Sequence, residues 1–220
     1  MKRTKITIGA VLLTAMAILF LNCKKDAVIP PPSNFAYSTF TDSRDGKVYK
    51  SIRIGNQEWM AENLAYKTES GSWTYWNDAN YGLIYGRLYT WEAAKLAVPS
   101  GWHIPTDAEW KQLEMLLGMS QTDADRTDFR GTNEGSKLKG TSGWAEKGNG
   151  TNDVGFNALG GGFLTNSGSF VSREASGYWW TATEISNESA YFRLLVYNTN
   201  TISRNSSFKL DACSIRCVKN

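Results

Sequence analysis

All nine tryptophans of this 220-residue chain lie between Trp59 and Trp180. The chain also has 20 glycines, and only two of its five prolines, Pro99 and Pro105, follow residue 34. Bulky aromatic side chains fill a core, and frequent glycines supply turns between short elements. This mixture predicts short strands, turns and aromatic packing rather than a helical bundle.

The first residues have the pattern of an export signal. Lys2, Arg3 and Lys5 precede residues 6–21, which carry no charge. Such a run makes a helix of about 24 Å, which is short for a bilayer core of about 30 Å. A basic start and a short apolar run predict a signal peptide over residues 1–22, with a plain signal anchor as the alternative.

A cysteine, Cys23, follows the apolar run directly and precedes Lys24, Lys25 and Asp26. This arrangement resembles lipoprotein signals, especially those of the Bacteroidetes, although Asn22 stands where Gly, Ala or Ser is usual. The resemblance implies that Cys23 is acylated and becomes the new N-terminus. The expected location is the cell envelope, as an outer-membrane lipoprotein that is periplasmic or surface-exposed, with its lipid bound to the membrane.

Residues 23–34 then form a predicted tether, because Pro30 to Pro32 favour an extended polyproline spacer. The folded domain is expected over residues 35–220. Removal of residues 1–22 removes three of the 24 basic residues and none of the 21 acidic ones, so the remainder carries no net charge. A neutral domain has no field to attract a polyanion, which argues against a nucleic-acid partner.

The order of the predicted elements indicates an α+β domain. Residues 48–54 alternate as a strand, and Gly55-Asn56 turns the chain into a partner at 58–61. A long loop is expected over residues 66–82. Helices are expected at 91–97, capped by Thr90, at 107–117, where Thr106 and Glu109 form a capping box before Gly118, and at 120–127. An antiparallel β-meander is expected from about residue 156, with its last strand at 214–218.

Several motifs in order resemble one known family, the Fibrobacter succinogenes major paralogous domain. The resemblance covers about residues 40–220 and implies a lipoprotein context but no particular activity. The motifs are Phe40–Gly46, Ile54–Leu64, Tyr85–Trp91, Ser100–Trp110, Tyr178–Glu184 and Ser214–Val218.

A more distant likeness concerns the stretch from His103 to Trp110. It resembles the Leu-Pro-Thr-Glu-Ala-Glu-Trp stretch of formylglycine-generating sulfatase-modifying enzymes, which implies their C-type-lectin-like fold. The activity of those enzymes is not expected here, because Cys213 and Cys217 do not match the family's paired catalytic cysteines.

The cysteines depart from the family pattern. Members of the paralogous family usually carry a cysteine where this chain has Val98, paired with the position of Cys217, so that long-range disulfide is expected to be absent. In a regular strand the Cα atoms of Cys213 and Cys217 would lie about 13 Å apart. A disulfide needs about 4.4–6.8 Å, so these two thiols are either free or joined through a local turn.

The best candidate for ligand binding is the aromatic segment within residues 66–82. Ring faces can stack on sugars or ligand rings, while amides and carboxylates bind hydroxyl groups. The alternative is that these rings fill the core. The residues are Trp73, Tyr75, Trp76, Asn77, Asp78 and Tyr81.

Other candidate residues favour structural roles. Glu184 and Arg216 are expected to form a structural pair between strands, or to hold a ligand if they face a cleft. His103 is the only histidine, so a packed structural role is expected and no histidine cluster can bind zinc. Asp123, Asp125 and Glu134 have the spacing of a calcium loop, but Asp128 stands at its glycine position. No catalytic residue, metal or cofactor is therefore predicted.

Together these features predict a lipid-anchored cell-envelope binding module that recognises a glycan or an extracellular protein. Whether the chain is an enzyme is left open, with a negative answer preferred. The alternatives are an enzyme that acts on envelope polymers through two converging carboxylates, and a purely structural surface protein without a concave site.

Overall fold

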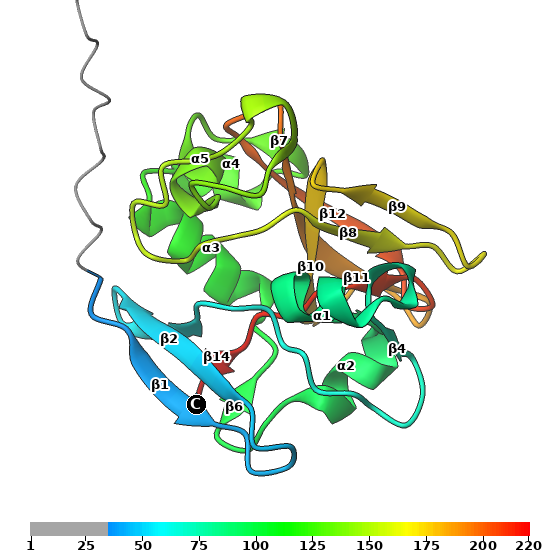
Figure 1. Ribbon diagram of the computed structural model, residues 1–220. Coiled ribbons are helices and arrows are strands. Elements are labelled where there is room, and N and C mark those ends of the chain that lie inside the picture. The colour runs from blue at the N-terminus through cyan, green and yellow to red at the C-terminus, as the bar shows by residue number, and fades with distance from the viewer. Residues whose placement is uncertain (1–34) are drawn as a thin grey trace, which may run out of the picture. The chain divides into compact units, whose positions relative to one another are not determined.

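The structure is a computed structural model that describes residues 35–220. The predicted signal peptide, the acylated Cys23 and the tether lie outside the described residues. Figure 1 shows two sheets with short helices packed around them, and the C-terminus beside the strands of the first sheet. The α+β class is confirmed: early antiparallel hairpins and several short helices precede a largely antiparallel sheet. Between residues 35 and 220, no helix has both the length and the apolar character that a membrane crossing requires.

The first sheet is built around the predicted hairpin. Ser51 pairs with Met60 and Ile54 with Gln57, so Gly55 and Asn56 form the two-residue turn. Gly55 has a φ of +60°, which glycine adopts without steric cost. In spatial order the strands are β1 (Ser38–Thr41), β2 (Val48–Ile54), β3 (Gln57–Met60), β14 (Val218–Lys219) and β6 (Trp102–His103).

The predicted helices form where their caps indicated. Thr90 caps one helix by accepting a hydrogen bond from Ala93 N, and Thr106 and Glu109 form the capping box of another. Two short 3-10 turns also occur, at Tyr75–Asn77 and Ala145–Lys147. The α-helices are α1 (Ala79–Tyr85), α2 (Trp91–Ala97), α3 (Asp107–Leu116), α4 (Gln121–Asp125) and α5 (Glu134–Leu138).

The second sheet contains the predicted meander, with one parallel pair. Gly177 of β10 pairs in parallel with Gly162 of β8, while the neighbouring ladders are antiparallel. The hairpin β8–β9 projects from one side of the domain in Figure 1. In spatial order the strands are β4 (Ser72–Trp73), β5 (Leu88–Thr90), β13 (Ala212–Cys213), β8 (Gly161–Leu164), β10 (Ser176–Glu184), β11 (Ser189–Val196), β12 (Ile202–Phe208) and β7 (Asp128–Arg130), with β9 (Phe170–Arg173) paired to β8.

Tryptophans form much of the core, as the composition indicated. Trp59 of β3, Trp110 of α3 and Phe156 pack edge to face, with ring centroids 5.0–5.6 Å apart. Trp180 packs in a second buried cluster around α2 and donates its indole N–H to Tyr89 O at 2.8 Å. These rings join the first sheet, the helices and the second sheet, and such pairs contribute beyond their buried area.

The expected loop over residues 66–82 is wrong in part, because it contains β4, a 3-10 turn and the start of α1. Asp78 caps α1 by accepting a hydrogen bond from Asn80 N at 2.8 Å, and Gly86 ends the helix with a φ of +73°. Leu83 and Ile84 of this helix are both exposed, so its apolar residues do not form one buried face. Hydrophobic periodicity therefore could not indicate it.

The expected terminal strand at 214–218 is also wrong. The chain forms β13 before it and β14 at its end, and the buried residues between them are irregular. Their carbonyl groups bind distant parts of the chain, because Leu64 N donates to Ile215 O and Met60 N donates to Cys217 O, each at 2.9 Å. The segment is thus held by single long-range hydrogen bonds within the chain rather than by a continuous ladder.

Cys213 and Cys217 are both free thiols in this structure and both are fully buried. Burial raises the pKa of each thiol above its ordinary value. Thiol reactivity depends on the thiolate and on access, so neither residue is expected to react in the folded protein.

We therefore expect iodoacetamide to leave Cys213 and Cys217 unmodified under native conditions and to modify both after denaturation without reductant. Peptide mapping by mass spectrometry locates the label. A pair that resists labelling after denaturation, and yields to it only with reductant, would show a disulfide and contradict this expectation.

Candidate functional site

The predicted ligand-binding residues come together on one short segment beside the β8–β9 hairpin. Trp73 lies in β4, the 3-10 turn contains Tyr75, Trp76 and Asn77, and Asp78 caps α1, which contains Tyr81. The Tyr75 ring centroid lies 5.3 Å from that of Trp76 and 6.1 Å from that of Tyr81. The segment is therefore one aromatic cluster rather than a series of separate anchors.

Tyr75 and Trp76 have opposite environments. Tyr75 is 4% exposed, whereas Trp76 is 59% exposed. Tyr75 lies against Gly162 of β8, where an added Cβ would come within 2.5 Å of Tyr75 Cε2. The two alternatives from the sequence thus apply to different rings, because Tyr75 fills the interior and Trp76 faces solvent.

The backbone holds Trp76 in an unusual conformation. Trp76 and Asn77 are consecutive non-glycine residues with φ angles of 54° and 58°. A left-handed conformation costs of order 1–3 kcal/mol for a residue with a side chain, and such strain concentrates at binding sites. The turn is closed by hydrogen bonds from Asn77 N to Thr74 O and from Asp78 N to Tyr75 O.

A cation covers the same rings. The guanidinium carbon of Arg173, at the end of β9, lies 4.1 Å from the Tyr81 ring centroid and 5.2 Å from that of Trp76. Arg173 Nη2 also lies 3.5 Å from Glu174 Oε1. A cation–π contact of this kind contributes about 0.5–1 kcal/mol at an exposed site. Arg173 therefore couples the aromatic segment to the β8–β9 hairpin.

A cavity of about 210 Å³ opens between that hairpin and the aromatic segment. The segment contributes Trp73 and Asn77, and the hairpin contributes Thr165, Asn166 and Phe170, with Gly168 at its turn and Leu210 nearby. A wall of ring faces with a few amide and hydroxyl groups is typical of sites for small polar ligands.

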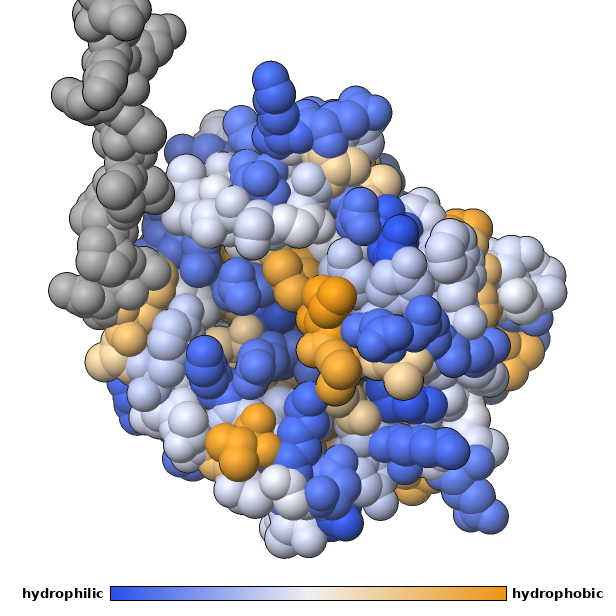
Figure 2. All heavy atoms as spheres, in the orientation of Figure 1, coloured by the Kyte–Doolittle hydropathy of each residue, from blue (hydrophilic) through white to orange (hydrophobic). Residues whose placement is uncertain are grey.

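The largest apolar feature on the face shown in Figure 2 lies over α1, where Leu83 and Ile84 are 78% and 57% exposed. They line a second cavity, of about 220 Å³, together with Lys47, Glu62, Asn63 and Arg216. This cavity differs from the first because charged groups line it.

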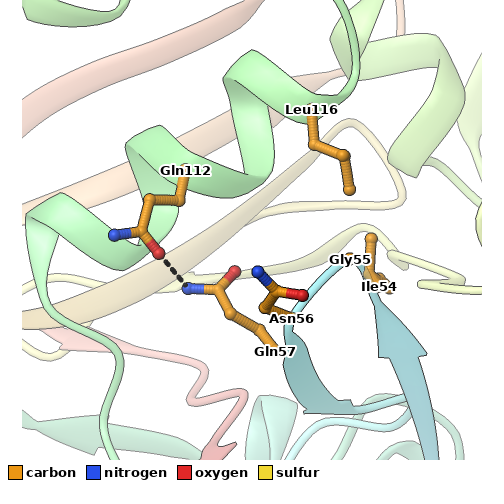
Figure 3. Close-up of a pocket in the computed structure, with 6 residues that line it drawn as sticks. All are labelled: Ile54, Gly55, Asn56, Gln57, Gln112 and Leu116. Carbon is orange, nitrogen blue, oxygen red and sulfur yellow. Dashed lines mark hydrogen bonds between the residues drawn. The ribbon is translucent and has the colours of Figure 1, made fainter.

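A broader groove of about 430 Å³ separates the β2–β3 turn from α3. Figure 3 shows Gln57 and Gln112 pointing toward one another across it, with Gln57 Nε2 3.2 Å from Gln112 Oε1. Leu116 and Ile54 form its apolar side. No lining residue titrates near neutral pH, so this groove offers surface complementarity but no acid–base chemistry.

The enzyme alternative expects two carboxylates in one cleft. Glu62 is the single carboxylate in the cavity beside α1, and Glu146 is the single carboxylate in a cavity of about 540 Å³ near Lys139. Within residues 35–220, no group of three or more His, Cys, Asp or Glu side chains is arranged to hold a metal ion.

A family model described as the Fibrobacter succinogenes major domain matches residues 52–219. The chain belongs to this family. No curated protein and no solved structure matches it. The matched region contains the whole aromatic segment, the β8–β9 hairpin and Arg216, whereas Lys47 of the cavity beside α1 precedes it.

The predicted pairing of Glu184 with Arg216 is wrong, because each side chain has other partners in this structure. Glu184 Oε2 instead accepts a hydrogen bond from Lys209 Nζ at 2.7 Å on the surface. Arg216 is buried and donates to Asn63 Oδ1. Glu184 lies at the exposed end of β10, whereas Arg216 lies within the buried irregular segment between β13 and β14, where a regular strand was expected.

The structure also reveals a buried charge network that the sequence analysis missed. Glu114 accepts from Arg193 Nε at 2.6 Å and from Arg130 Nη2 at 2.5 Å, and Asp107 binds Arg193 and Arg204. Burial would raise the pKa of Asp107, but the hydrogen bonds and charges of the arginines lower it to about 2. Asp107 and Glu114 are seven residues apart on one face of α3, which is the sequence signal that could have indicated a pair.

His103 has the structural role that was expected. Its Nε2 lies 2.7 Å from Glu109 Oε1 and its Nδ1 lies 2.7 Å from Asn220 Oδ1. The imidazole thus connects the capping box of α3 to Asn220, which directly follows β14. Both ring nitrogens are occupied by structural partners, so no general-base role follows from this position.

Proposed function

We propose that this protein is a lipid-anchored cell-envelope module that binds glycans through the aromatic segment, on a C-type-lectin-like scaffold. The observation that carries the proposal is the exposed Trp76 ring. A left-handed turn and Arg173 hold it beside the 210 Å³ cavity that contains Trp73 and Asn77.

The chemistry of this surface suits a carbohydrate. The C–H face of a sugar ring can stack on an exposed indole, and hydroxyl groups can bind the amides of Asn77 and Asn166 and the hydroxyl of Thr165. Tyr75 is buried against β8, so the surface is preformed rather than assembled on binding. Preformed sites lose less conformational entropy when they bind.

The leader supports the location. The basic start, the short apolar run and Cys23 are the features of a lipoprotein signal, and the proline-rich tether would place the domain away from the bilayer surface. An anchored domain of no net charge suits recognition of neutral polymers in the envelope.

We expect glycan-array screening to identify a ligand that Trp76→Ala binds at least about tenfold more weakly, because loss of one stacking ring removes about 1.4 kcal/mol or more. Isothermal titration calorimetry then gives the affinities. Phe129→Ala is the matched control, since Phe129 is also an exposed ring but lies on β7, at the opposite end of the second sheet from β4. Equal binding by the Trp76 variant and the parent would refute the site.

A further inference from the structure

Arg216 is a buried cation without an acidic partner. Arg216 is 1% exposed, and the acceptors of its hydrogen bonds are all neutral: Asn63 Oδ1, Phe156 O and Asn157 O. Among residues 35–220, no carboxylate forms an ion pair with it. These are four hydrogen bonds for the five N–H groups of a guanidinium, which leaves one N–H of Nη1 without a described acceptor.

Each of the other buried cations among residues 35–220 has either a carboxylate partner or a full set of acceptors, although Arg130 Nε has no acceptor. Arg193 and Arg204 bind the carboxylate of Asp107, and Arg130 binds that of Glu114. Lys139 lacks a carboxylate, but its three ammonium N–H groups have three carbonyl acceptors, on Val196, Tyr197 and Thr199. Arg216 is therefore the buried cation whose charge and hydrogen-bonding capacity are both incompletely met by the described residues.

Arg216 lines the 220 Å³ cavity beside α1. Lys47 is a second cation in its wall, and Glu62 is the one carboxylate. Glu62 Oε2 accepts a hydrogen bond from the backbone N–H of Lys50 at 2.7 Å. Burial lowers the pKa of Arg216 and the charge of Glu62 raises it by less, but the two side chains form no direct ion pair. The cavity therefore has an excess of one positive charge, and an anion placed there would meet a desolvated guanidinium.

Asn63 fixes the guanidinium in this wall. Its Oδ1 accepts from Arg216 Nε at 3.2 Å, from Arg216 Nη2 at 2.9 Å and from Trp179 Nε1 at 2.9 Å. Its Nδ2 donates to Tyr85 O and Ser214 Oγ. A guanidinium held in this way is preorganised, so its binding of an anion costs little side-chain entropy.

We propose that this cavity binds an organic carboxylate with a small apolar group. Arg216 pairs with the carboxylate, Lys47 adds a second positive charge, and Leu83, Ile84 and Leu159 contact the apolar group. A guanidinium and a carboxylate match in shape and charge, and such hydrogen bonds are about twice as strong as neutral ones. A volume of 220 Å³ suits a compact acid or the C-terminal residue of a peptide.

The test uses the purified full-length chain and titration followed by NMR or calorimetry. Isovalerate is expected to bind, whereas the neutral isovaleramide is not. A short peptide that ends in leucine is compared with its C-terminally amidated form, which distinguishes a peptide terminus from a free acid as the source of the carboxylate. Binding of the amides as tightly as the acids, binding of inorganic phosphate as tightly as isovalerate, or no binding of either acid would overturn the proposal.

Variants then locate the site. Lys47→Gln is expected to weaken isovalerate binding about threefold to fivefold, because it removes an attractive charge. Ile84→Asp is expected to weaken it about tenfold, because it adds a charge that repels the carboxylate. Lys67→Gln is the matched control, because Lys67 is exposed and outside the cavity. Ile84 is exposed and Lys47 is half-buried, so these variants are expected to fold. Equal affinity in all of them would refute the site, while Trp76→Ala is expected to leave isovalerate binding unchanged.

Discussion

The Glu114→Gln variant is expected to lose about 3–5 kcal/mol of unfolding free energy, because it breaks a buried ion network by removing one partner. Glu114 is fully buried and binds both Arg193 and Arg130. Glutamine keeps the shape but removes the charge, and its amide N–H groups would face arginine donors. Arg130 would be left with Ile202 O as its remaining described acceptor, since its Nε already has none.

Urea unfolding followed by circular dichroism measures this effect. Glu92→Gln is the control, because Glu92 makes a comparable 2.7 Å ion pair with Lys95 on the surface. Exposed pairs contribute about 0–1 kcal/mol, so the control is expected to change little. A loss below about 1 kcal/mol in Glu114→Gln would contradict the assigned role of the network and would indicate that water reaches the arginines.

The second large effect is expected for Asn63→Ala, which should cost at least about 3 kcal/mol of unfolding free energy. Removal of the amide leaves Trp179 Nε1 and two N–H groups of Arg216 without their acceptor in a buried place. Each unsatisfied buried group costs about 1–3 kcal/mol, and a charged group costs more. The same change frees the guanidinium that the proposed carboxylate site requires.

Asn205→Ala is the matched control for this variant, because Asn205 is exposed; its side chain donates to Asp128 Oδ1 at 3.1 Å and accepts from Ser206 N at 2.8 Å. Its expected change is within about 0.5 kcal/mol. Thermal and urea unfolding of both variants provide the comparison. Similar stabilities for Asn63→Ala and Asn205→Ala would show that Asn63 is not the residue that holds Arg216 and Trp179.

The sequence predicted the features that depend on neighbouring residues. The Gly55-Asn56 hairpin turn, the Thr90 cap and the Thr106–Glu109 capping box all form as expected. Each is encoded within a few positions, where backbone preferences and local hydrogen bonds decide the conformation. The same locality allowed the sequence to indicate the aromatic segment, since six candidate residues lie within nine positions.

The segment 66–82 and the chain end show where local reasoning failed. Helix α1 exposes Leu83 and Ile84, so it lacks the apolar period that identifies a packed helix. The end of the chain is irregular between β13 and β14, where Ile215 O accepts from Leu64 N outside any strand and Cys217 O accepts from Met60 N of β3. At the chain end, contacts with residues far away in the chain override the local pattern.

By itself the sequence determined the leader pattern, the neutral charge of the domain, the α+β class and the starts of α2, α3 and α4. Only the tertiary structure decided which ring of the aromatic segment is buried, that Glu184 and Arg216 have different partners, and that Asp107 and Glu114 meet three arginines from distant strands. The physical reason is that a buried charge must be compensated wherever it lies, and the compensating groups here are separated by up to 97 positions along the chain.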